Sequence, residues 1–82
     1  MITVKEAVNE VKNKTGYEFI IKVKDYDQNH YVVEAIPKKN ELPEPGIQTT
    51  FGVDKNTGKV TSFYLIPGET LEKYLACKVC NY

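Results

Sequence analysis

The stretch YEFIIKVKDYDQNHYVVEAI, residues 17–36, decides the fold of this 82-residue chain. From Tyr17 to Lys24 apolar and polar residues alternate, which is the period-two pattern of a strand with one buried face. Asp25 to Asn29 has the composition of a turn, and His30 to Ile36 alternates again. Two such strands joined by a short turn pair antiparallel, so the sequence predicts a β-hairpin over 17–36.

A helix is predicted before the hairpin. Thr3 and Glu6 have the spacing of a capping box, in which each side chain bonds the backbone amide of the other residue. Gly16 is placed to end the helix in a left-handed conformation. Between these signals the apolar residues recur at helical spacing and form one stripe: Val4, Ala7, Val8 and Val11.

Two further strands and a second helix are predicted after the hairpin. Residues 37–46 contain three prolines and form a loop, because proline cannot donate to a strand ladder. Strands are expected over 47–54 and 59–66, joined by a tight turn in which Gly58 supplies a positive φ. A short helix then runs from Glu69 to about Lys78.

These elements predict the α+β class. The N-terminal helix packs on a four-stranded antiparallel sheet in the order α-β-β-β-β-α, and the C-terminal helix is short. The whole chain, 1–82, is one domain, because 82 residues cannot assemble a second core. Residues 77–82 are expected to be a frayed tail.

The charge composition argues against nucleic acid as a partner. Eleven lysines balance eleven acidic residues, there is no arginine, and the pI is about 6.6. Nucleic-acid binders carry a positive field and depend on the bidentate guanidinium group, and this chain lacks both.

The chain is expected to be cytoplasmic and to bind no membrane. No segment reaches the ~18 apolar residues needed to span a bilayer. The start Met1-Ile-Thr-Val-Lys-Glu6 turns polar too soon for the apolar region of a signal peptide. Two cysteines close together cannot staple a fold, which agrees with a reducing compartment.

The pattern resembles a known family. The start Ile2-Thr-Val-Lys-Glu-Ala, the strand YVVEAIP and the segment FGVDKNTGKVTSF together look like the helix-plus-sheet unit of PepSY-type domains over residues 2–66. The same start and turn also resemble short phage or prophage proteins of unknown function. The resemblance implies a non-catalytic regulatory or interaction module. PepSY-type domains are usually exported, whereas this chain shows no leader.

Cys77-Lys-Val-Cys80 is the most suggestive motif for chemistry. Two-residue spacing suits thiolate ligands of zinc, but a second ligand pair is missing, so a closed site would take one pair from each of two chains. A thiol-redox site is a further alternative, although such motifs open a helix and this one closes a helix. Two cysteines without a function are the third reading.

No catalytic site is recognised, and the chain is not expected to be an enzyme. His30 has no nucleophile at a readable spacing. Asp25 and Asp27 resemble the start of a calcium loop, but Ile36 stands where that loop needs glutamate. Oxygens of Asp54 and its turn neighbours are explained by turn formation.

A contact surface is predicted on the sheet face away from the first helix. Strict alternation places the apolar residues Ile20, Val32, Ile36 and Phe63 on that face. If the face is bare, the chain is a protein-interaction or inhibitory module that binds a protein partner, a second copy of itself included. If the C-terminal helix folds back over the face, no such patch exists.

Overall fold

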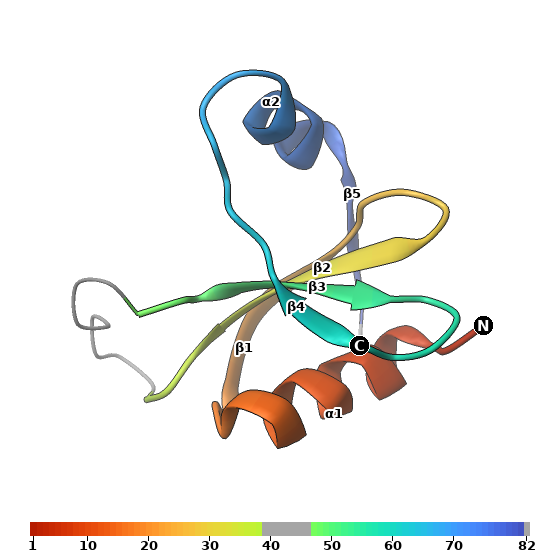
Figure 1. The fold of residues 1–82 in the computed structure, drawn as a ribbon, viewed down its shortest axis with the longest axis vertical. Helices are drawn as coiled ribbons and strands as arrows, with labels where there is room; N and C mark the ends of the chain where they lie inside the picture. Colours follow the sequence, from red (N-terminus) through yellow and green to blue (C-terminus); the bar gives the residue numbers. More distant parts are fainter. Residues whose placement is uncertain (39–46, 82) are drawn as a thin grey trace.

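Five antiparallel strands form the centre of the molecule, whose computed structural model describes residues 1–38 and 47–81. Their spatial order is β4-β3-β2-β1-β5. In chain order the elements are α1 (Val4–Thr15), β1 (Phe19–Asp25), β2 (His30–Ile36), β3 (Thr50–Asp54), β4 (Val60–Ser62), α2 (Glu69–Ala76) and β5 (Lys78–Cys80) (Figure 1).

The predicted α+β class and element order are confirmed, but the sheet gains a strand. Lys78–Cys80 pairs antiparallel with β1, with Val79 opposite Lys24. The prediction of a frayed tail from Cys77 onward is therefore wrong for this segment. Three residues give no readable period, so only the pairing with β1 identifies the strand.

Helix α1 begins and ends as its sequence predicts. The Thr3 hydroxyl accepts from the Glu6 amide and the Glu6 carboxylate accepts from the Thr3 amide, both at 3.1 Å. At the other end Gly16 has φ of 76° and donates its amide to the Lys12 carbonyl at 2.8 Å. Both helix ends are thus satisfied by local groups.

The β1–β2 hairpin matches the prediction, with one irregularity. β2 has the predicted bounds, and Val23 pairs with Val33 in the centre. The register shifts between Ile20 and Lys22, so one extra residue is inserted in β1. Because of this bulge, Ile20 lies on the same face as Val23, and Ile21 is exposed.

β3 and β4 are shorter than predicted, at five and three residues. β4 ends at Ser62 because the chain then leaves the sheet and runs over residues 63–68 to α2 (Figure 1). Their connecting turn is as expected, since Gly58 has φ of 78°. Residues 39–46 of the predicted proline-rich loop lie outside the described residues.

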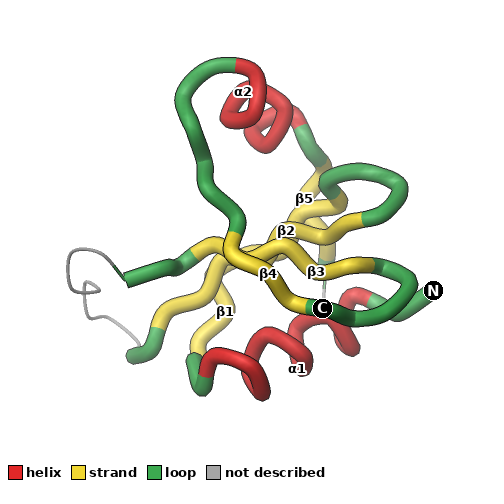
Figure 2. Tube along the Cα trace, viewed as in Figure 1, coloured by secondary structure: helices red, strands yellow, loops and turns green. Residues whose placement is uncertain are grey.

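The main core lies between α1 and one face of the sheet. Figure 2 shows α1 and α2 on opposite sides of the sheet. The helix contributes only alanine and valine, and the sheet adds two aromatic side chains to its own alanine and valines. The buried cluster comprises Ala7, Val8, Val11, Val23, Tyr31, Val33, Ala35, Phe51 and Val53.

Removing the helix cap tests the start of α1. We expect Thr3→Ala to lower the free energy of unfolding by about 1 kcal/mol, because the Glu6 amide loses its acceptor. Urea unfolding followed by circular dichroism measures the change. Lys5→Ala, at an exposed position of the same turn, is the control and should leave stability within about 0.5 kcal/mol. Equal effects of the two substitutions would contradict the assignment.

Candidate functional site

The sheet face opposite α1 is covered rather than bare. Val32 lies on this face and is fully buried. Helix α2 lies on this side of the sheet, opposite α1, and its Tyr74 is also buried, at 3% exposure. The expectation of a bare second face is therefore wrong around Val32, where the C-terminal segment covers the sheet, whereas Ile36 on the same face is only half-buried.

Lys24 joins α2 to the sheet. Its ammonium group is buried and donates to the carbonyl of Tyr74 at 2.9 Å and to that of Leu75 at 3.4 Å. The same nitrogen lies 4.5 Å from the centroid of the Tyr74 ring. These carbonyls are at the C-terminal, negative end of α2, where a cation is favoured. Lys24 thus provides a donor for the Leu75 carbonyl and a second donor for the Tyr74 carbonyl, which also accepts from the Cys77 amide.

Two aromatic residues, Tyr26 and Phe63, pack together beside α2 at the β1–β2 turn. The rings of Tyr26 and Phe63 meet edge to face, with centroids 5.0 Å apart. The Lys73 ammonium lies 4.5 Å from the Tyr26 ring centroid. The segment before α2 and α2 itself are therefore both held against the same turn.

The four predicted contact residues do not form one surface. Ile20 packs against the α1 core, because the β1 bulge moves it to that face. Val32 is buried under the cover. Ile36 and Phe63 are half-buried, and Phe63 is engaged with Tyr26. Strict alternation failed at the bulge and did not show what α2 covers.

Four of the seven large apolar side chains that are exposed among the described residues lie along α2 and the segments that flank it. We call them, together with the half-buried Leu71, the α2 stripe. Tyr64, Ile66, Leu75 and Val79 are each 55–64% exposed. The sequence placed Tyr64 and Ile66 in a strand and predicted that Leu75 and Val79 face inward, and both predictions are wrong. Pro67-Gly68 directly after Ile66, and the four-residue spacing of Leu71 and Leu75, were the available signals.

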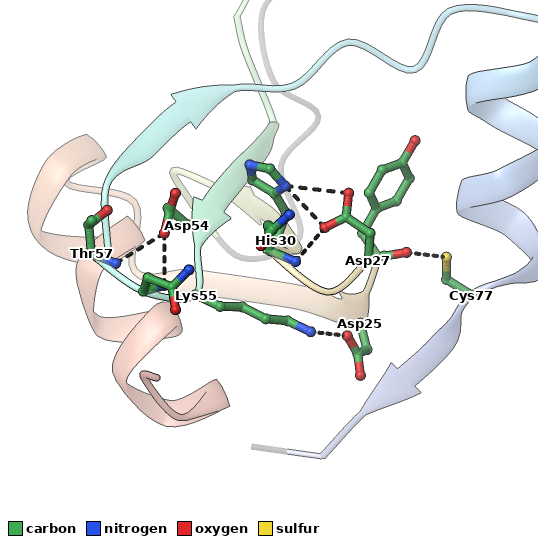
Figure 3. A network of polar contacts seen from close by, with 10 residues as sticks. Asp25, Asp27, His30, Asp54, Lys55, Thr57 and Cys77 are labelled. Atoms are coloured by element: carbon green, nitrogen blue, oxygen red, sulfur yellow. Dashed lines mark hydrogen bonds and ion pairs between the residues drawn. The ribbon is translucent and has the colours of Figure 1, made fainter.

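His30 is paired with a carboxylate and not with a nucleophile (Figure 3). Its Nδ1 lies 3.1 Å from Asp27 Oδ1. Partial burial opposes ionisation of Asp27, but hydrogen bonds from the Asn29 amide and from His30 outweigh it and hold the pKa of Asp27 below the usual 3.8. Among the described residues, the structure gives His30 no contact with a hydroxyl or thiol group. The pair orders the β1–β2 turn.

Lys55 contacts the end of β1, the β1–β2 turn and the start of the chain, on the α1 side of the sheet. Its ammonium group is paired with Asp25 and lies 4.8 Å from the Tyr31 ring centroid. Its amide donates to the Asn29 carbonyl, and its carbonyl accepts from the Ile2 amide, each at 2.7 Å. Both turns and the chain start meet at this residue, so Asp25 is structural and not part of a calcium loop.

The turn aspartate Asp54 is likewise used by its own turn. Its carboxylate accepts from the amides of Asn56 and Thr57 at 2.7 and 3.0 Å, and these bonds lower its pKa. A groove of about 380 Å³ lies between this turn and α1, with Lys14 and Lys59 in its lining. The amides of residues 56–59 all donate within the turn, so they leave no donor for an anion there.

The two thiols lie on opposite sides of β5. Cys77 Sγ donates to the Lys73 carbonyl at 2.9 Å and approaches the Tyr26 carbonyl at 3.5 Å, on the side of α2. Cys80 packs against the α1 core, and burial raises the pKa of its thiol. The described residues contain no group of three or more histidine, cysteine or acidic side chains that would hold a metal ion. Cys77 and Cys80 of one chain therefore do not form a ready ligand pair for zinc.

Comparisons with protein-family models, curated proteins and solved structures find no match. The resemblance to PepSY-type domains and to short phage proteins therefore stays a prediction. Neither helix of the described chain is long and apolar enough to cross a membrane. Function has to be argued from the surface itself.

The Tyr74 hydroxyl group is buried, and no partner for it exists among the described residues. Burial, together with the nearby negative charge of Glu34, raises the pKa of Tyr74 to about 12. The folded chain thus holds this proton more tightly than the unfolded chain, whose phenol titrates near 10. The stabilisation is complete below pH 10 and is lost as the pH rises toward 12.

The variant Tyr74→Phe tests this assignment. We expect it to unfold at the same or a higher urea concentration at pH 8, because an unpaired buried hydroxyl is removed. Between pH 10 and 11.5 it should lose less stability than the wild type does. Tyr64→Phe, at an exposed tyrosine, is the control and should follow the wild type. Identical pH profiles of all three chains would contradict the buried titration.

Proposed function

We propose that this protein is a non-catalytic protein-interaction module that binds a second copy of itself through the α2 stripe. The observation that carries the proposal is the exposure of four large apolar side chains on one short helix and its flanks. Exposed apolar side chains that lie together mark contact surfaces more often than single ones do.

Backbone contacts and helical spacing link the members of the stripe from Ile66 to Val79. The Leu71 amide donates to the Ile66 carbonyl at 3.3 Å, so the linker and the helix start lie together. Leu71 and Leu75 are four residues apart and therefore neighbours on one helix face. Leu75 and Val79 both lie beside Lys24, one through its carbonyl and the other as its strand partner.

Charge favours a second copy as the occupant. The first turn of α2 carries Glu69 and Glu72, whereas Lys73 lies in its last turn. Two copies related by a twofold axis, with α2 antiparallel, would bring the acidic end of each helix to the basic end of the other. The net charge of zero adds no general repulsion between copies.

A non-catalytic role fits the polar groups. His30 and Asp27 are engaged with each other, and Asp25 with Lys55. The implied PepSY-like role, a regulatory or interaction module, supports the same class of function, and we place the protein in the cytoplasm. A partner protein of a different sequence is the other occupant that the test must distinguish.

Leu75→Ser tests the stripe. We expect it to raise the Kd of self-association at least about tenfold, because it removes a large apolar side chain from the proposed contact. Sedimentation equilibrium measures the Kd. Ile21→Ser, at an exposed position on β1, is the matched control and should not change it. A wild-type chain that stays monomeric at about 1 mM, the weak end of specific binding, would contradict the proposal.

A charge exchange tests the antiparallel arrangement. Glu72→Lys should weaken self-association about fivefold, because like charges then face each other across the twofold axis. The double variant Glu72→Lys/Lys73→Glu should recover most of the wild-type affinity. If the double variant binds no better than the single one, the helices do not pair in this orientation, whatever the wild-type Kd.

A further inference from the structure

The two cysteines cannot form a disulfide while β5 is paired. Cys77 is extended, with φ of −74° and ψ of 150°, and Lys78–Cys80 forms the strand. Extended residues advance about 3.3 Å each, which places the Cα atoms of Cys77 and Cys80 about 10 Å apart. A disulfide requires Cα atoms closer than about 7 Å.

The directions of the side chains add to this separation. Cys80 pairs with Val23 and packs against the α1 core, whereas Cys77 Sγ contacts carbonyl groups on the α2 side. Moving the two sulfurs together requires the chain between them to fold back. That movement breaks the three β5 pairs with Val23, Lys24 and Asp25.

We propose that Cys77 and Cys80 form a redox-sensitive latch: their oxidation to a disulfide releases β5 from β1 and loosens α2 from the second face of the sheet. Pairing of β5 with β1 and formation of the Cys77–Cys80 disulfide exclude each other. The free energy by which the paired strand disfavours the disulfide therefore equals the free energy by which the disulfide disfavours the paired strand. The paired strand therefore holds the dithiol in its reduced form.

The oxidant is a small disulfide such as oxidised glutathione. One protein thiolate attacks it, forming a mixed disulfide and releasing one molecule of reduced glutathione. The second protein thiolate then attacks the protein sulfur of that mixed disulfide and releases a second molecule. The protein loses two hydrogens and two electrons, which reduce the glutathione disulfide to two thiols.

The loosening of α2 follows from its attachments. β5 continues directly from α2, and Lys24 lies between the two, since it pairs with Val79 and donates to the last carbonyls of the helix. The Cys77 thiol, which contacts the Tyr26 carbonyl, is consumed in the disulfide. Val32 and Tyr74 would then become accessible.

The effect on self-association rests on the proposed function, because Leu75 and Val79 belong to the α2 stripe. The latch itself does not rest on it. Its readouts are the thiol state and the amide exchange of a dilute monomer, so a failure of the dimer proposal leaves them unchanged, and the reverse also holds.

The experiment equilibrates the full chain with glutathione buffers of increasing oxidised-to-reduced ratio and follows it by mass spectrometry and hydrogen exchange. We expect an intramolecular disulfide, and with it an increase in amide exchange of at least about tenfold in β5 and α2. Amides of α1, β2 and β3 should stay protected. A disulfide without faster exchange in β5, or only glutathione adducts and interchain bonds at every ratio, would overturn the proposal.

Matched lysine variants test the coupling. Lys24→Met removes the ammonium group that holds α2, so half-oxidation should require about tenfold less oxidising buffer than in the wild type. Lys22→Met, on the same strand and the same face, is the control and should match the wild type. If Lys24→Met and Lys22→Met are half-oxidised at the same ratio of oxidised to reduced glutathione, the proposed coupling between the Lys24–α2 contact and the disulfide is wrong. In Cys80→Ser, a glutathione adduct on Cys77 should leave β5 protected, and opening there would show that the intramolecular bond is not the cause.

Discussion

The buried ammonium group of Lys24 determines how the second face of this small protein closes. Helix α2 has only eight residues, and its last carbonyl groups lie beside β1. Lys24, the second-last residue of β1, donates to the carbonyls of Tyr74 and Leu75 and also lies against the Tyr74 ring. A buried charge is tolerated only with such partners, so β1, α2 and β5 depend on one another.

A second buried lysine has the corresponding role on the other side. Lys55 joins the β3–β4 turn to the β1–β2 turn and, through its backbone, to the start of α1. Both lysines also lie against a tyrosine ring. A chain with small aliphatic core residues thus supplements its two thin layers with cation–aromatic and cation–carbonyl contacts. The polar network of Figure 3 belongs to this framework, whereas the exterior of α2 is the surface through which we propose that a second copy binds.

Local sequence patterns predicted most of the fold. The capping box at Thr3, the left-handed Gly16 and the β2 alternation are decided by neighbours in the sequence, and each was predicted correctly. The bulge at Ile21 was not predicted. An inserted residue leaves the apolar composition of β1 unchanged but reverses the sheet faces on which the residues before it lie. That reversal moved Ile20 from the predicted contact surface into the core. Likewise, residues 63–66 have the apolar, aromatic-rich composition of a strand but connect the sheet to α2.

The sequence by itself determined the class of the fold, the order of its elements, the main core beneath α1 and the neutrality of the chain, because periodicity, capping and charge are properties of neighbouring residues. Only the tertiary structure decided that Lys78–Cys80 is a strand, that Val32 is covered, and that the two thiols face apart. Each of these depends on contacts between the C-terminal segment and β1 or the turn after it, which are about fifty residues apart in the sequence. A three-residue strand and a single lysine have no period from which such a contact is predicted.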